Sequence, residues 1–215
     1  SWLSRNEHFE TATREFIERI YEDSAFRNDF EAFVQPLIEP GRVNSLSQLL
    51  LKLTSPGIPD MYQGSEIWDL SLVDPDNRRP VDFDLRRRLF SELAHLKVEE
   101  VRQRTDEGLP KLWVTHHTLG ARRQRPEAFG DGGTYTPLAA KGPKAAHLIA
   151  YMRGNGVLVA APRLVLTLNG DWGGTSLELP QGKWRNQFSD AVLEGGNIDA
   201  GELLSSFPVA LLMKE

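Results

Sequence analysis

Residues 55–79 read SPGIPDMYQGSEIWDLSLVDPDNRR, a short apolar run that gives way to alternating carboxylates, amides, aromatic rings and arginines. The opening Ser-Pro-Gly is typical of a helix end, because proline and glycine both interrupt helical hydrogen bonding. The segment GIPDMYQG is too short for a helix. Its few apolar positions predict a short buried strand over residues 57–62, followed by a long polar loop.

This loop carries side chains that suit sugar binding. Between Asp60 and Asp84 it contains carboxylates, the amides of Gln63 and Asn77, guanidinium groups and flat rings. Sugar hydroxyls need fixed donors and acceptors, and an arginine fork can orient a neighbouring carboxylate. A solvated loop whose charges pair at the surface has the same composition, so composition leaves both interpretations open.

Helices are predicted on both sides of the loop. Apolar residues at helical spacing predict a helix over residues 7–33, with Asn6 as its N-cap, and a second helix over residues 43–53 that ends at the Ser-Pro-Gly. Two further helices are predicted over residues 85–104 and 110–125.

Strand-length apolar runs separated by turn residues follow residue 130. They read AHLIAYMR, GVLVAAPRLVL, TSLELP, KWRNQF and FPVALLMK, and they predict a small antiparallel sandwich or barrel. The fold class is therefore predicted as α/β plus all-β, with an α/β region in residues 1–130 and an antiparallel β-domain in residues 131–215.

Composition narrows the classes of function. The net charge is -5 and the basic residues are interleaved with acidic ones, so no nucleic-acid partner is expected. The absence of cysteine excludes disulfides and thiolate sites, and it fits a cytoplasmic location. The sequence shows neither a membrane span nor a signal peptide, so no membrane association is expected. The chain begins with Ser rather than Met, which predicts a fragment of a longer protein.

The order of residues in the loop resembles the eighth-strand region of the α-amylase family of (β/α)8 glycoside hydrolases and transglycosidases. That family carries the pattern G-x-P-x-x-Y-x-G-x-E at its last barrel strand, matched here by Gly57, Pro59, Tyr62, Gly64 and Glu66. The resemblance implies that residues 1–130 form the C-terminal end of a (β/α)8 TIM barrel, with its helices and eighth strand. Residues 131–215 would then form an antiparallel β-sandwich.

Longer stretches narrow the resemblance to one branch of this family. Residues 50–83, RPEAFGDGGTYTPL at 125–138 and FPVALL at 207–212 resemble enzymes that rearrange maltooligosaccharides. These enzymes convert the reducing-end α-1,4 linkage into an α,α-1,1 linkage by intramolecular transglycosylation. The three catalytic carboxylates of such enzymes follow earlier barrel strands, so the resemblance implies no catalytic residue in this chain. No cofactor or metal is expected.

The resemblance implies a substrate-binding role for the eighth-strand loop. A maltooligosaccharide is the expected ligand, and the remainder of the catalytic barrel is the expected partner. The residues assigned to substrate binding are Tyr62, Gln63, Glu66, Asp74, Asn77 and Arg78. Related α-glucosidases carry an R-x-P segment beside the cleaved bond, which favours Arg78 over Arg79.

Several alternatives remain open at this point. The chain could come from another α-amylase-family glucosidase or transglucosidase, or be a non-catalytic carbohydrate-binding module. Glu66 with Asp60 or Asp74 could also be a catalytic carboxylate pair. His116 and His117 are adjacent on a predicted helix, where their side chains diverge, so we do not expect them to chelate one metal.

Overall fold

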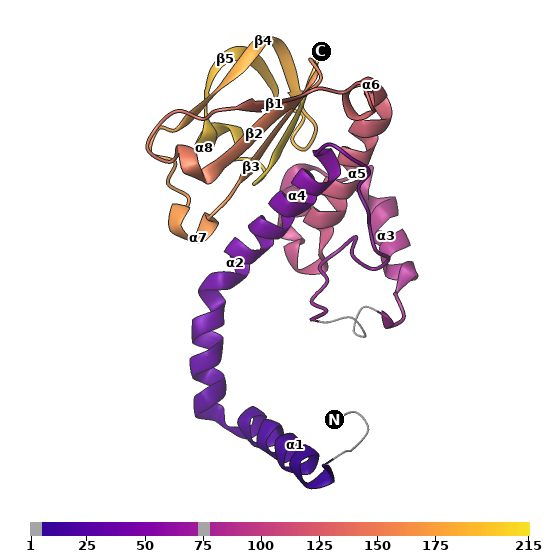
Figure 1. Cartoon of the computed structure of the whole chain (residues 1–215), viewed down its shortest axis with the longest axis vertical. Helices are drawn as coiled ribbons and strands as arrows, with labels where there is room; N and C mark the ends of the chain where they lie inside the picture. Colours follow the sequence, from indigo (N-terminus) through magenta and orange to yellow (C-terminus); the bar gives the residue numbers. More distant parts are fainter. Residues whose placement is uncertain (1–5, 73–77) are drawn as a thin grey trace. The chain divides into compact units, whose positions relative to one another are not determined.

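The computed structural model describes residues 6–72 and 78–215 of the chain (Figure 1). The chain divides into two compact units, one comprising the residues up to Gly41 and the other running Arg42–Glu215. The helices are α1 (Glu7–Glu22), α2 (Ser24–Thr54), α3 (Phe83–Leu93), α4 (Val98–Gln103), α5 (Leu109–Gln124), α6 (Pro126–Phe129), α7 (Val165–Leu168) and α8 (Ala200–Leu203), with short 3-10 turns at Thr105–Glu107 and Ala145–His147.

The first two helices meet at Asp23. The Asn6 side chain accepts a hydrogen bond from the Phe9 amide, which confirms the predicted N-cap of α1. The predicted break between residues 33 and 43 is wrong, since α2 continues through Pro36 and Pro40 and ends at Thr54. The break lies at Asp23 because its carboxylate accepts from the Ala25 and Phe26 amides and so caps a new helix.

The predicted helix over residues 85–104 is two helices, α3 and α4. Helix α4 begins with one half of a capping box, in which the Lys97 backbone amide donates to the Glu100 carboxylate at 2.8 Å. The helix predicted over residues 110–125 is confirmed as α5, with Pro126 just beyond its end.

The described residues after 130 form one six-stranded antiparallel sheet. Its strands are β1 (Tyr135–Leu138), β2 (Leu148–Arg153), β3 (Val157–Pro162), β4 (Ser176–Asn186), β5 (Val192–Asp199) and β6 (Ala210–Lys214). Their order across the sheet is β1-β2-β3-β6-β4-β5, and each pair is antiparallel. The predicted antiparallel strands are thus confirmed, but they form one curled sheet instead of a sandwich of two.

Two segments that were predicted as separate strands, TSLELP and KWRNQF, are halves of β4. The register of β4 against β5 shifts between Leu179 and Lys183, where a bulge bends the strand. Gly195 and Gly196, which on sequence alone favour a turn between two strands, instead lie inside β5. A side chain at Gly195 would come within 2.5 Å of the Pro180 carbonyl, so glycine is needed for this close backbone approach.

The two faces of the sheet bury different cores. One face packs with α8 around Trp184, Leu158 and Leu212. The other shares a core with α5 and with the end of α2, where Trp113 Nε1 donates to the Phe188 carbonyl at 3.2 Å. Figure 1 shows the sheet beside these helices. The helices from Arg42 onward and the sheet therefore make one compact unit.

The strand predicted over residues 57–62 is absent from the described structure. Ile58 is 99% exposed, and no amide of residues 57–62 donates a hydrogen bond to another described residue. A lone parallel strand cannot satisfy its backbone groups without neighbours, so the segment remains irregular. The TIM-barrel end and the boundary at residue 130 stay predictions.

In residues 6–72 and 78–215, no helix combines the length and the apolar character that crossing a membrane requires.

Candidate functional site

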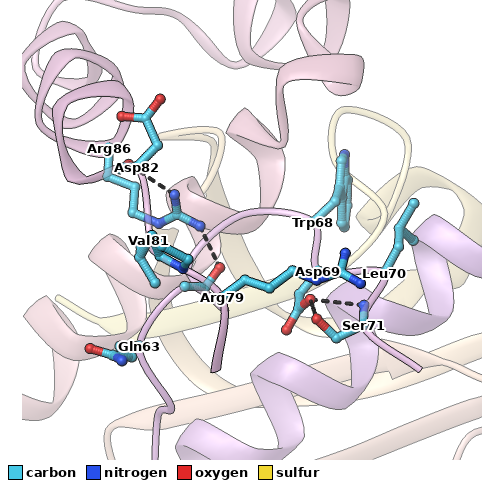
Figure 2. A pocket seen from close by; sticks show the side chains of 11 residues that line it. Gln63, Trp68, Asp69, Leu70, Ser71, Arg79, Val81, Asp82 and Arg86 are labelled. Carbon is cyan, nitrogen blue, oxygen red and sulfur yellow. Dashed lines mark hydrogen bonds between the residues drawn. The ribbon is translucent and has the colours of Figure 1, made fainter. Parts of the chain in front are cut away.

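The loop that follows α2 is held to α3 by a single arginine. Arg86 Nε donates to Glu66 Oε2 at 2.8 Å, while its two terminal nitrogens donate to the carbonyl oxygens of Gly64 and Asp82 (Figure 2). The Arg86–Glu66 pair is mostly buried, so it is less screened than a surface ion pair. Arg86 thereby joins the two ends of the loop.

Gly64 allows the loop to turn tightly beside Val81. Its φ is +92°, a left-handed conformation that strongly favours glycine. A Cβ at this position would also approach Val81 Cγ2 to 3.2 Å. The glycine of the G-x-E segment therefore has a backbone role in shaping the pocket next to it.

A cavity of about 330 Å³ lies between the loop and the start of α3 (Figure 2). Its lining mixes charged groups, an amide and an indole ring. The lining residues are Gln63, Gly64, Trp68, Asp69, Leu70, Ser71, Arg79, Pro80, Val81, Asp82 and Arg86.

Asp69 is the most organised acceptor of this cavity. Its Oδ1 accepts from the Ser71 hydroxyl at 2.5 Å and from the Ser71 amide at 2.9 Å. These two bonds lower the pKa of Asp69, and the positive charges of Lys111 and Arg86 lower it further. Figure 2 shows Arg79 pointing toward Asp69. The pocket therefore holds an ionised acceptor close to guanidinium donors.

The indole of Trp68 is fixed at the edge of the cavity. Its Nε1 donates to the Thr105 carbonyl at 2.6 Å, which sets the plane of the ring. The backbone beside it packs on Gly108, where a Cβ would lie 2.6 Å from the Ile67 Cβ. A fixed ring next to hydrogen-bonding groups is an arrangement that can bind a sugar through one face and its hydroxyls.

The residues predicted to bind substrate differ from one another in their position relative to the cavity. Gln63 lines the cavity, and Glu66 lies behind its wall, bound to Arg86. Tyr62 is 49% exposed and, like Arg78, lies outside the lining. Asp74 and Asn77 lie outside the described residues. Their binding roles stay predictions.

Sequence reasoning did not assign Trp68, Asp69, Ser71, Arg79 and Arg86 to the site, although all five line the cavity. On sequence alone, Arg86, Arg87 and Arg88 beside Asp82 and Asp84 favour a solvated or salt-bridged helix face. The available signal was the spacing of Arg86 to the buried residues Leu89 and Leu93, which puts all three on one face of α3.

In the part of the chain that the structure describes, no group of three or more histidine, cysteine, aspartate or glutamate side chains is placed to hold a metal ion.

Comparisons with known proteins agree on one kind of enzyme. No protein-family profile matches the chain. The chain is 38% identical over 216 aligned positions to a Mycobacterium tuberculosis protein named "Putative maltooligosyl trehalose synthase", covering 100% of this chain and 26% of that protein.

Two solved structures lead to the same result. Maltooligosyltrehalose synthase from Arthrobacter ramosus matches with a TM-score of 0.87 and 36% identity, covering 100% of this chain and 28% of the other. A second maltooligosyl trehalose synthase matches with a TM-score of 0.77 and 26% identity, over 100% of this chain and 28% of the other. The chain spans about a quarter of the length of these relatives. Over its whole length, the chain is therefore related in sequence and structure to the C-terminal part of maltooligosyltrehalose synthases.

Proposed function

We propose that this chain is the C-terminal portion of an intramolecular transglycosylase that converts the reducing-end α-1,4 linkage of a maltooligosaccharide into an α,α-1,1 linkage. The observation that carries this proposal is the match of the entire chain to maltooligosyltrehalose synthases in both sequence and fold. The polar cavity beside the G-x-P-x-x-Y-x-G-x-E segment supports it, because the cavity holds groups that suit a sugar.

The chemistry itself is assigned to carboxylates outside this chain. The role of residues 57–82 is to hold the sugar: the ionised Asp69 accepts hydrogen bonds from hydroxyls, Arg79 donates, and the Trp68 ring offers a face for C–H groups. Tyr62, Gln63, Glu66, Asp74, Asn77 and Arg78 are proposed to extend this surface in the complete enzyme. Such groups orient substrate and so act on turnover more than on stability.

The partners follow from the same proposal. The complete enzyme would bind a maltooligosaccharide, and the rest of the catalytic barrel would pack against this chain. We also propose a cytoplasmic location, which the lack of cysteine supports.

The proposal is tested by measuring the activity of the chain alone and then of the chain joined to the rest of a related enzyme. The 215-residue chain is first incubated alone with maltohexaose, where we expect no loss of reducing ends. It is then joined to the remaining three quarters of the Arthrobacter ramosus enzyme, in place of the matching quarter, and we expect a non-reducing product with a terminal α,α-1,1 linkage. Turnover by the chain alone would mean that its catalytic groups lie inside it.

Variants of this joined enzyme test the site. Arg78→Ala and Asp69→Asn are each expected to lower kcat/KM by about 10- to 100-fold with an unchanged unfolding midpoint, because they misplace substrate. Arg87→Ala is the matched control, since Arg87 is exposed, pairs with Asp84 on the surface of α3 and does not line the cavity. Release of glucose as the main product would favour a hydrolase, and sugar binding without any turnover would favour a binding module.

A further inference from the structure

A second cavity, of about 490 Å³, lies on another part of the Arg42–Glu215 unit and has no role in the proposed reaction. Its lining comes from the chain just after α2, from the region around α6 and from two arginines. The residues are Pro56, Gly57, Ile58, Arg122, Pro126, Phe129, Gly130, Asp131, Gly133 and Arg153. Half of them belong to the segment RPEAFGDGGTYTPL, whose function the sugar site does not explain.

Arg153 is a buried cation at the base of this cavity. It ends β2 and is only 1% exposed. Its Nε donates to the Ala128 carbonyl at 3.2 Å, but its Nη1 is buried and has no hydrogen-bond partner among the described residues. A buried charged nitrogen without a partner is costly, because it has lost water and gained nothing in exchange.

Arg122 brings a second positive charge to the same place. Its Nη1 donates to the Leu53 carbonyl at 2.9 Å. The guanidinium carbons of Arg122 and Arg153 lie 4.9 Å and 5.7 Å from the centre of the Phe129 ring. Burial lowers the pKa of Arg122, and the charge of Arg153 lowers it further. The two cations thus destabilise each other.

No carboxylate among the described residues forms an ion pair with either arginine. Among the described residues, neither Arg122 nor Arg153 forms an ion pair, and both guanidinium groups use only carbonyl oxygens and the Phe129 ring. Asp131 contributes to the cavity lining but is exposed and makes no ion pair. The cavity therefore combines room for a ligand with two positive charges that lack a counter-charge.

We propose that this cavity is an oxyanion site, in which a carboxylate or phosphate group binds Arg122 and Arg153 against Phe129. A planar guanidinium offers parallel donors that match the oxygens of such groups, and two of them can share one anion. The site is separate from the sugar pocket and the proposal does not depend on the sugar reaction.

The surroundings favour a carboxylate carried by a polypeptide over a free ion. Ile58, on the cavity wall, is 99% exposed, and an apolar side chain of this size gains free energy when a protein segment covers it. A free ion would leave Ile58 in water. The covering segment would then bring both an apolar contact and the acidic side chain.

Thermal unfolding of the 215-residue chain tests the oxyanion chemistry. The unfolding temperature is measured in sodium phosphate and in sodium acetate against sodium chloride at equal ionic strength. Specific binding at a saturating concentration is expected to raise it by about 2–4 °C in the native chain. Arg122→Met and Arg153→Met should each lose this increase, whereas Arg163→Met, an exposed arginine outside the cavity, should keep it. Because Arg122 is only half-buried, its variant remains informative even if the Arg153 variant does not fold.

Equal increases in the native chain and in both cavity variants would overturn the proposal, since phosphate also stabilises proteins without binding. The same would hold if no anion had any effect. The source of the anion is decided by repeating the titration on the joined enzyme described above. Loss of the Arg122-dependent response there supports a polypeptide carboxylate that already fills the site. A persistent response would show that the natural ligand is a free anion.

Discussion

Residues 6–41 and the β-sheet differ in how far their apolar side chains are buried. Helix α1 has no buried residue, although Phe9 and Phe16 recur on it at helical spacing, and Phe16 is 63% exposed. In β3, by contrast, every residue is buried between the two cores. Both segments are strongly patterned, so patterning alone does not ensure burial. An apolar helix face is buried only when another part of the protein packs against it, and the pattern of the helix itself does not supply that part.

The difference in burial arises from how far along the chain the packing partners of each region lie. The strands of the sheet bury one another within about 80 residues, from Tyr135 to Lys214. The phenylalanines of α1 and of the first half of α2, including Phe30 and Phe33, are exposed in the described structure. If the chain is one quarter of a barrel enzyme, as proposed, the other three quarters of that enzyme would cover these phenylalanines. The contrast between the two regions can be measured directly.

Hydrogen exchange should show the largest contrast. Amides of β3 and β6 are expected to exchange at least ~10⁴-fold more slowly than amides of residues 57–62, because only global unfolding opens the sheet centre. Amides of α1 should also exchange quickly, because none of the residues of this helix is buried in the described structure. Strong protection of residues 57–62 in a sample of this chain alone would contradict the absence of a strand there.

Truncating one large side chain in each region should give the next largest contrast. Trp184 is 0% exposed, and its Nε1 donates to the Pro180 carbonyl at 2.8 Å. Trp184→Ala is expected to lower the free energy of unfolding by about 3–5 kcal/mol, whereas Phe16→Ala should change it by less than ~0.5 kcal/mol. Urea titrations followed by circular dichroism measure both. Comparable losses would show that α1 is packed in solution.

Acid should weaken the contact between α5 and the sheet more than it weakens α1. The His117 ring lies tilted against Trp113 of the same helix, with ring centres 4.1 Å apart, and its edge meets the Phe188 ring just after β4 at 6.3 Å. Burial, aided by the charge of His116, lowers the pKa of His117 to about 4. The unfolded chain binds a proton near pH 6.5 and the folded chain only near pH 4. Stability is therefore lost as pH falls from 6.5 to 4, by about 1–2 kcal/mol after allowing for the partial exposure of the ring.

The measurement is the free energy of unfolding at several pH values between 7 and 4. His117→Gln should flatten the curve in this interval relative to the native chain. His8→Asn, at an exposed position on α1, is the control. A native slope that persists in the His117 variant would assign the acid sensitivity to other groups.

Helix caps should give the smallest contrast. Asn6 caps α1 by accepting from the Phe9 amide at 3.1 Å, and Asp199 caps α8 by accepting from the Glu202 amide at 3.1 Å. Asp199→Ala is expected to lower the free energy of unfolding by about 1 kcal/mol, since α8 packs into the sheet core. Asn6→Ala should reduce the helical signal slightly and leave the unfolding midpoint in place. A midpoint shift from Asn6→Ala would mean that α1 unfolds together with the sheet.

Periodicity in the sequence was enough to predict α5, β2 and β3. The apolar pattern of α5 extends over more than one helical turn, and the apolar runs of β2 and β3 are each several residues long. It did not find the helix break at Asp23 or the half capping box before Val98, since those depend on one side chain each. The prediction of a strand over residues 57–62 was wrong for another reason. Strands need partners, and no described residue supplies one.

The candidate site shows the same division. Gln63, at a variable position between Tyr62 and Gly64 of the motif, was assigned to substrate binding and lines the cavity. Asp69 and Arg79 stand 10 residues apart in the chain and were not assigned, because their approach to each other depends on the path of the loop and not on local spacing. Arg86 bonds residues on both sides of this path. A local motif therefore indicated a region of the chain, whereas the fold of the loop decides which side chains line the cavity.

The position of β6 has a consequence for how the protein is made. It is the last strand in the chain but lies between β3 and β4, where it joins the section β1–β3 to the section β4–β5. On the ribosome, both sections are synthesised before their link, and each exposes an unpaired edge in the meantime. The nascent chain should thus depend on chaperones until Ala210–Lys214 emerges. A stalled chain that ends before Ala210 should be cut rapidly by protease, and a chain that extends past Lys214 should lose that sensitivity in the sheet.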